Sequence, residues 1–195
     1  MRAEIQVKLL ENLLDEITKR YDSFIKEQNE KIEDTLEKAT KDPLTHLYNR
    51  EFLSEYAEKV LKENRRKGES IALIFLDLDN FKPVNDNYGH EEGDKVLKNV
   101  AEMLKNSFRD QDIVVRYGGD EFIVFAQLNR VQVYELNEVL KSLQNRIEDN
   151  FQKYGISISY GISIYPLEAN NLEVLIYIAD KKMYEQKKRK KLDEN

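Results

Sequence analysis

Cysteine is absent from the 195-residue sequence, and only two histidines, His46 and His90, are present. Without cysteine the chain has no disulfide, no thiolate metal ligand and no cysteine nucleophile. Two histidines are too few for a multi-histidine zinc centre. The sequence also lacks any apolar run near the ~20 residues of a membrane span, and its first residues include no apolar signal segment. We therefore expect a soluble, cytoplasmic protein with no membrane partner.

Basic residues are slightly outnumbered by acidic ones. Lys and Arg total 31 and Asp and Glu total 37, which gives a formal net charge of −6. A protein that binds a nucleic acid polymer needs a basic face to neutralise phosphates, so we expect no such polymer as a partner. With 41% hydrophobic residues and charges of mixed sign, the sequence can build an ordinary globular core.

Glycine and proline are scarce, and neither occurs in residues 1–41. Large or apolar side chains recur there at steps of three and four residues, at Leu10, Leu14, Ile17, Tyr21, Ile25, Ile32, Leu36 and Ala39, with Gln28 in the one gap. The steps mostly follow an eleven-residue rhythm, which predicts a nearly straight or weakly right-handed helix pair. We expect residues 1–41 to form a parallel coiled-coil dimer. The alternative is a single solvated helix folded back on the rest of the chain.

Residues 42–195 read as alternating helices and strands. Asp42-Pro43 ends the N-terminal pattern, because a residue before proline disfavours the helical conformation. Helical stripes follow at 52–61, 96–108, 133–147 and 175–183, and strand-like runs at 71–76, 113–117, 121–125 and 156–164. The last of these strands is expected to bury one face only. The β-α-β-β-α-β order after an opening helix predicts a ferredoxin-like α+β sandwich with a mainly antiparallel sheet flanked by helices.

Acidic residues lie where two of the predicted strands meet a turn. Asp77 directly follows six apolar residues, Asp79 comes two residues later, and Asp120-Glu121 follows Gly118-Gly119. The first strand and the hairpin are neighbours in this arrangement, so Asp77 and Asp120 are expected to converge. Carboxylates without nearby histidine or cysteine suit a hard cation such as Mg²⁺. Taken alone, the same residues also fit a polar hairpin tip with solvated acids.

Several motifs agree with one another in order and spacing. Arg116-Tyr117-Gly118-Gly119-Asp120-Glu121-Phe122 is accompanied by matching segments at 42–50, 77–86, 88–94 and 179–184. Together they resemble the GGDEF family, the bacterial diguanylate cyclases, over about residues 42–191. The resemblance implies that residues 42–195 form the catalytic domain, a nucleotidyl-cyclase palm with a basic C-terminal tail. It also implies condensation of two GTP molecules into cyclic di-GMP and two pyrophosphates across a homodimer, which the N-terminal helix would tether.

The resemblance also implies a metal site. Asp77, Asp120 and the backbone carbonyl of Leu78 would bind two Mg²⁺ ions on the triphosphate, with Mn²⁺ able to substitute. Such a pair of ions stabilises both the attacking and the leaving oxygen. Glu121 matches a signature acid that either binds metal or activates the 3′-hydroxyl, and both roles stay open. Asp79 receives no role from the resemblance.

Asn85 and Asp94 match the positions at which the family reads guanine. A carboxylate accepts hydrogen bonds from guanine N1–H and N2–H₂, whereas ATP would leave it unpaired, so Asp94 favours GTP. The alternative for Asp94 is an acid in the first turn of a helix, where it complements the helix dipole.

Lys187 falls where the family has a phosphate-binding lysine. The family usually continues with Gly-Arg-Asn, where this chain reads Lys190-Lys191-Leu192. Lys191 therefore stands in the position of an arginine and supplies the charge without the bidentate fork. The remaining basic residues, Lys188 to Lys190, are equally consistent with a solvated tail and with a phosphate-binding role.

Arg109 and Asp112 form an Arg-x-x-Asp pattern shortly before Gly118. At this offset the pattern resembles the family's inhibitory product site, and arginine suits the phosphates and guanine edges of cyclic di-GMP. The alternative is a surface ion pair.

We expect an active diguanylate cyclase with product inhibition. Two other readings stay open: a catalytically inactive cyclic di-GMP receptor, and a GTP-binding regulatory domain that acts on a partner through its coiled coil.

Overall fold

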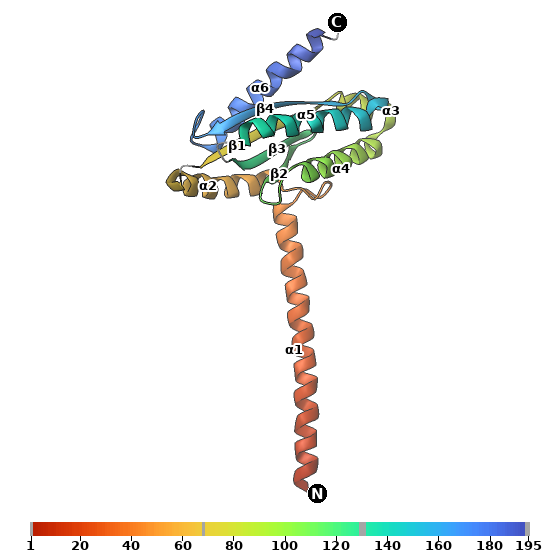
Figure 1. Cartoon of the computed structure of the whole chain (residues 1–195). Helices are drawn as coiled ribbons and strands as arrows, with labels where there is room; N and C mark the ends of the chain where they lie inside the picture. Colours follow the sequence, from red (N-terminus) through yellow and green to blue (C-terminus); the bar gives the residue numbers. More distant parts are fainter. Residues whose placement is uncertain (1, 68, 129–131, 194–195) are drawn as a thin grey trace. The chain divides into compact units, whose positions relative to one another are not determined.

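The computed structural model describes residues 2–67, 69–128 and 132–193. The chain forms two compact units, Met1–Thr40 and Lys41–Asn195. The second unit contains, in chain order, α2 (Arg50–Lys67), β1 (Ser70–Asp79), α3 (Phe81–Tyr88), α4 (His90–Ser107), β2 (Ile113–Gly118), β3 (Glu121–Leu128), α5 (Gln132–Asn150), the 3₁₀ turn η1 (Gln152–Tyr154), β4 (Ser157–Tyr165) and α6 (Leu172–Asp193) (Figure 1).

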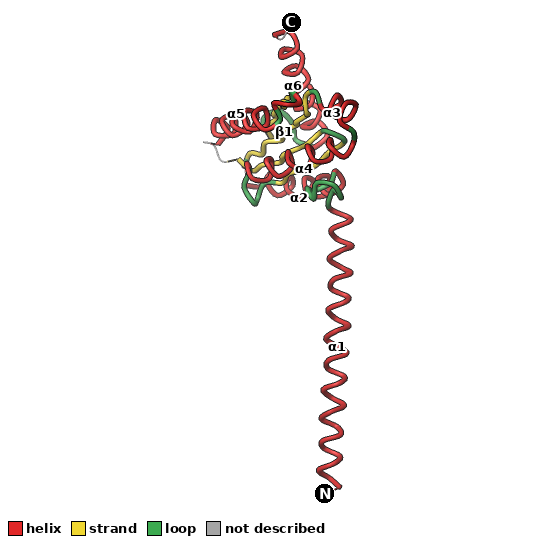
Figure 2. Tube along the Cα trace, turned by 90° about the vertical axis from the view of Figure 1, so that its right-hand side faces the viewer, coloured by secondary structure: helices red, strands yellow, loops and turns green. Residues whose placement is uncertain are grey.

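The first unit is α1 (Arg2–Thr40), one continuous helix (Figure 2). Ion pairs four residues apart, such as Asp15 with Lys19 at 2.7 Å, support it at its surface. The apolar stripe predicted from the sequence is exposed in the single chain, with Leu14 at 69% and Leu36 at 57%. Tertiary packing rather than propensity usually stabilises a helix in a protein, so this stripe is a surface suited to another helix.

The second unit is built on a four-stranded antiparallel sheet with the order β2-β3-β1-β4. Alternate residues of β1 face two separate cores. Ala72, Ile74, Leu76 and Leu78 pack with α3, α4 and α5, whereas Ile71, Leu73 and Phe75 pack with α2 and α6. Helices on both faces explain the unbroken apolar run in this central strand. The predicted ferredoxin-like α+β sandwich is confirmed.

One short helix, α3, was not among the elements predicted from the sequence. It has only eight residues and contains Pro83 at its third position, where the missing N–H costs little. Asn80 precedes it with a left-handed φ of 62°, and the Asn80 side chain donates a hydrogen bond to the Gly155 carbonyl at 3.0 Å. This turn sends the chain from the end of β1 into α3.

The expectation that the last strand buries only one face was wrong. Ser159 and Ser163, on the face opposite to its isoleucines, are both 0% exposed because α6 covers them. The Ser163 hydroxyl donates to the Leu175 carbonyl of α6 at 2.8 Å. Small residues therefore mark a close helix contact here rather than a solvent-facing surface.

Gly161→Ala is expected to lower the free energy of unfolding by about 2–3 kcal/mol, because overpacking at a backbone contact cannot relax locally. A Cβ at position 161 would lie 2.0 Å from the Ala179 carbonyl oxygen and 2.4 Å from the Met183 nitrogen of α6. Urea denaturation measures the loss. Gly119→Ala is the control, because a Cβ there meets nothing within 4 Å. Equal stability of the two variants would contradict the close approach of α6 to β4.

Candidate active site

Carboxylates converge at one end of the sheet, as the sequence predicted. Asp77 and Asp79 continue the face of β1 that α2 and α6 cover, because side chains alternate along a strand. Glu121 is the cross-strand partner of Asp77, and the Leu78 amide donates to the Asp120 carbonyl at 3.2 Å. The structure thus brings Asp77, Leu78, Asp120 and Glu121 together, and we call the three acids of this set together with Asp79 the acid cluster.

Helix α6 places a lysine in the acid cluster. The Lys187 ammonium donates to Asp77 and lies 3.6 Å from Asp79. Burial raises the pKa of Asp77, Lys187 offsets part of that rise, and the neighbouring Asp120 and Asp79 add to it. Burial likewise raises the pKa of Glu121, and the charges of Asp77 and Asp120 reinforce the effect. The cluster therefore concentrates negative charge and attracts a cation.

The donors suit Mg²⁺, because all of them are oxygen atoms. Over the described ranges 2–67, 69–128 and 132–193, no three acidic or histidine side chains lie close enough to hold a metal ion among themselves. The positive charge facing Asp77 is that of Lys187. We interpret this ammonium as the stand-in for a bound cation, so a metal would require Lys187 to move and other oxygens to complete its coordination.

A cavity of about 240 Å³ adjoins the acid cluster. We call it the lysine cavity, because four of its lining side chains are lysines. Lysine ammonium groups bind phosphate oxygens as compact charges. The lining residues are Leu78, Asp79, Asn80, Phe81, Lys82, Pro83, Asp120, Ser157, Lys187, Lys190 and Lys191. Both lysines predicted to bind phosphate, Lys187 and Lys191, are among them.

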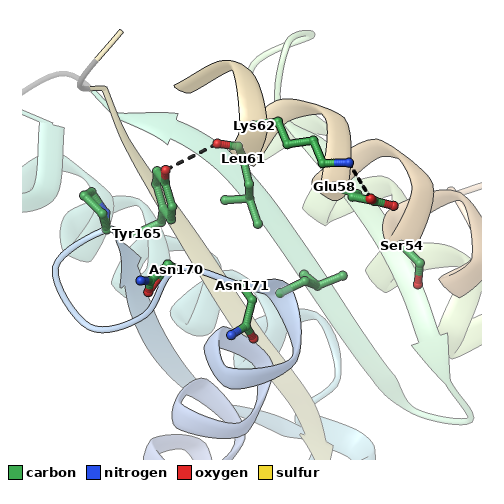
Figure 3. Close-up of a pocket in the computed structure, with 9 residues that line it drawn as sticks. Ser54, Glu58, Leu61, Lys62, Tyr165, Asn170 and Asn171 are labelled. Atoms are coloured by element: carbon green, nitrogen blue, oxygen red, sulfur yellow. Dashed lines mark hydrogen bonds and ion pairs between the residues drawn. The ribbon is translucent and has the colours of Figure 1, made fainter. Parts of the chain in front are cut away.

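A larger cavity, about 380 Å³, lies between α2 and the start of α6 (Figure 3). Its one lysine, Lys62, is paired with Glu58 at 2.6 Å, and the Tyr165 hydroxyl donates to the Leu61 carbonyl at 3.3 Å. This cavity has no cluster of acids and no surplus of positive charge. The groups that suit a metal and a polyphosphate are therefore those of the acid cluster and the lysine cavity.

The two predicted guanine-reading residues lie on consecutive helices, Asn85 on α3 and Asp94 on α4. Gly93 brings the helices close at this point, because a Cβ there would lie 2.0 Å from Asn85 Oδ1. The Asn85 amide therefore packs against the turn of α4 that carries the exposed Asp94. The role of Gly93 was missed, although a glycine inside a helical pattern is itself a signal of close packing.

Arg116 fixes the Gly118-Gly119 turn, a role that sequence reasoning also missed. The Arg116 guanidinium donates to both Asp42 oxygens, at 3.0 and 3.2 Å, and twice to the Gly119 carbonyl, at 3.1 and 2.9 Å. Burial raises the pKa of Asp42, but hydrogen bonds from Thr45 and from Arg116 outweigh it and leave the pKa below its ordinary value. Residues 42–45 are thereby tied to the turn that carries Asp120.

Arg116→Ala is expected to lower the free energy of unfolding by about 2–3 kcal/mol at neutral pH, because it leaves the half-buried Asp42 carboxylate without its cation. Arg116→Lys should recover part of this loss. The lowered pKa of Asp42 means that the stabilisation is present above the ordinary value of 3.8 and is lost as the pH falls through the folded-state pKa. Denaturation at neutral and acidic pH checks this. A difference between wild type and Arg116→Ala that grows on acidification would contradict it.

The Arg-x-x-Asp segment forms a tight turn. The Arg109 amide donates to Asp112 Oδ2 at 3.1 Å, and the Asp112 amide donates to the Arg109 carbonyl at 2.9 Å. Burial raises the pKa of Asp112. Both residues line two neighbouring cavities of about 80 and 190 Å³, and Lys41 and Lys105 contribute to the second. The second cavity thus presents three basic side chains, Lys41, Lys105 and Arg109, beside the carboxylates of Asp110 and Asp112.

Residues 39–192 match the family described as diguanylate cyclase, GGDEF domain. The chain therefore belongs to the GGDEF family of diguanylate cyclases, as its motifs predicted. It is 35% identical over 150 residues to the cyclic di-GMP phosphodiesterase NbdA of Pseudomonas aeruginosa, covering 75% of this chain and 19% of that protein. It is 39% identical over 146 residues to the diguanylate cyclase DgcS of Shewanella oneidensis, covering 75% of this chain and 49% of that protein. The chain thus spans less than half the length of these relatives.

Among solved structures, the chain resembles the coiled coil and GGDEF domain of DgcB from Caulobacter crescentus in complex with c-di-GMP. The TM-score is 0.77 at 24% identity, over 90% of this chain and 94% of that chain. This likeness concerns the fold. In the described part of the chain, none of the helices combines the length and the apolar character needed to cross a membrane.

Proposed function

We propose that this chain is a diguanylate cyclase, which condenses two GTP molecules into cyclic di-GMP and two pyrophosphates. The observation that carries the proposal is the acid cluster, which adjoins a cavity lined by four lysines. Family membership supports it, as does the similarity to DgcS, a protein named as a diguanylate cyclase. All the acids that the family signature requires are intact, which favours catalysis over the receptor alternative.

In this proposal Asp77, Asp120 and the Leu78 carbonyl hold two Mg²⁺ ions, for which Mn²⁺ can substitute. When bound, the ions supply stabilisation of the negative charge that develops on the attacking and leaving oxygens. Glu121 completes the site, either as a further ligand or by accepting the proton of the 3′-hydroxyl. The ammonium groups of Lys187 and Lys191 bind the triphosphate.

In the proposal, guanine is recognised by one residue on α3 and one on α4. The Asp94 carboxylate accepts from guanine N1–H and N2–H₂, and the Asn85 amide addresses the remaining polar atoms of the base. Adenine would leave Asp94 without donors, and an unpaired carboxylate in a binding site is a costly mismatch. GTP is therefore the expected substrate and ATP is expected to be rejected.

Ring closure requires two domains, because each GTP supplies a 3′-hydroxyl that attacks the α-phosphate of the other. We propose that α1 pairs in parallel with α1 of a second copy through its exposed apolar stripe, and so forms a homodimer. Such a tether raises the effective concentration of the two domains. The DgcB structure likewise comprises a coiled coil and a GGDEF domain, which agrees with pairing of α1 in a coiled coil.

Arg109 and Asp112 are proposed to bind the product, cyclic di-GMP, and to inhibit the enzyme. The basic side chains that line the neighbouring cavity support an anionic ligand at this place. Bound product would then mask activity in a freshly purified sample.

Incubation of the chain with GTP and Mg²⁺ tests the proposal, with nucleotides separated by chromatography and identified by mass. A cyclic di-GMP phosphodiesterase is added in parallel to drain carried-over product. We expect cyclic di-GMP, or its linear breakdown product where the phosphodiesterase is present, and no dinucleotide from ATP. Absence of turnover at every protein concentration, together with tight cyclic di-GMP binding, would identify a receptor instead.

A further inference from the structure

Asp79 has no role in the proposed chemistry, yet it is closely surrounded by hydrogen-bond donors. The residue is only 7% exposed. Its carboxylate accepts hydrogen bonds from the Ser157 hydroxyl at 2.9 Å, the Ser159 hydroxyl at 2.8 Å and the Lys190 ammonium at 3.0 Å. A buried carboxylate is stable only with such partners, and here the nearest full charge is that of Lys190.

Lys190 is fully engaged by the protein. Its ammonium lies 3.0 Å from Asp79 Oδ2, 3.3 Å from the Ser157 hydroxyl and 2.5 Å from the Ile158 carbonyl. An ammonium has three donors, so these contacts use its whole capacity. The side chain is 24% exposed, so Lys190 is not part of a solvated tail.

Asp79 forms ion pairs with two lysines, and of the two it is Lys190 that also hydrogen-bonds to it. Lys187 is 3.6 Å from Asp79 but hydrogen-bonds to Asp77. If Lys190 were absent, Lys187 would be the nearest cation left for the buried Asp79 charge. The Lys187 ammonium, already hydrogen-bonded to Asp77 and 3.6 Å from Asp79, would then be drawn closer to Asp79 and become less available to a phosphate.

We propose that Lys190 is a positioning residue that satisfies Asp79 and thereby keeps Lys187 available to the polyphosphate of the nucleotide. This rests on the proposed function only in taking GTP as that nucleotide. The position is a distinctive one, because the family that the sequence resembles usually has glycine there. Lys190 also anchors the end of α6 to β4 through the Ile158 carbonyl, and this contact fixes the helix turn that presents Lys191 to the lysine cavity.

The test is the affinity for a non-hydrolysable GTP analogue with Mg²⁺, measured by calorimetry on the full chain. Lys190→Ala is expected to weaken binding about tenfold, the size expected when a charge-assisted contact is lost. Lys190→Arg keeps the charge and should bind within about threefold of wild type. The matched control is Lys188→Ala on the same helix. Lys188 lies 4.5 Å from the Tyr184 ring and does not line the lysine cavity, so its removal should leave the affinity unchanged.

Asp79→Asn distinguishes positioning from simple support of the helix. In the double variant Lys190→Ala/Asp79→Asn the carboxylate that would capture Lys187 is gone, so binding should return to within about threefold of wild type. A loss in Lys190→Ala no larger than in Lys188→Ala, or a double variant that binds no better than Lys190→Ala, would overturn the proposal. Turnover is measured separately: wild type that binds the analogue but forms no product contradicts the cyclase function and leaves this test in force.

Discussion

Asp120→Ala is expected to abolish cyclic di-GMP formation, lowering the rate about a thousandfold or more. The Asp120 carbonyl accepts a hydrogen bond from the Leu78 amide, and Asp120 therefore lies beside Asp77. Removing its carboxylate takes away a proposed ligand of the Mg²⁺ ions that would stabilise the transition state. Product formation from GTP and Mg²⁺, followed by chromatography, measures the effect.

A matched control for this variant is Asp149→Ala, because Asp149 is an exposed acid on α5. Its removal changes the net charge equally and should leave the rate within about twofold of wild type. Cyclic di-GMP binding at the product site proposed for Arg109 and Asp112, together with urea denaturation, reports whether the Asp120→Ala domain is folded. A folded Asp120→Ala protein with normal turnover would show that the acid cluster is not the catalytic centre.

Removal of residues 1–40 is expected to lower the specific activity about a hundredfold at sub-micromolar protein, and to make it rise with protein concentration. Residues 41–195 form a compact unit of their own, so the shortened chain retains the site. What it loses is the proposed tether between two GTP-loaded domains. Activity per chain over a dilution series, alongside sedimentation of both proteins, measures the change.

Replacing residues 1–40 with an unrelated parallel dimeric coiled coil should restore activity at low concentration. One-residue insertions near Gln28 examine a further hypothesis, in which the packing register of α1 determines whether the two half-sites face each other. Equal and concentration-independent activity of the full and shortened chains would contradict the tethered dimer. Insertions without effect would contradict the register hypothesis alone.

Much of the fold could be predicted from the sequence because periodicity and motif order agreed. The apolar run in β1 indicated a strand covered on both faces, and Gly118-Gly119 marked the β2–β3 hairpin. The short helix α3 was not predicted, because Pro83 and eight residues give too weak a periodic signal. The covered serines of β4 were misjudged, since small polar residues look solvent-facing until a helix is known to pack on them.

The candidate site was predictable as far as it depends on neighbouring strands. Convergence of Asp77 with Asp120 followed from strand order alone. The contacts of Lys187 with Asp77, of Lys190 with Asp79 and of Arg116 with Asp42 did not, because each joins segments far apart in the chain, 110 residues in the case of Lys187. They depend on how α6 and residues 42–45 dock on the sheet, and a spacing pattern carries no information about docking.

Condensation of two GTP molecules by this chain can be followed in an isotope-mixing assay. An equimolar mixture of ordinary and heavy-isotope GTP is incubated with the full chain and Mg²⁺, and the dinucleotides are resolved by mass. If two GTP molecules are joined, light, mixed and heavy cyclic di-GMP form, with the mixed species most abundant, and all three are absent with Asp120→Ala. Only unreacted GTP at every protein concentration, with the phosphodiesterase present, would contradict condensation by this chain.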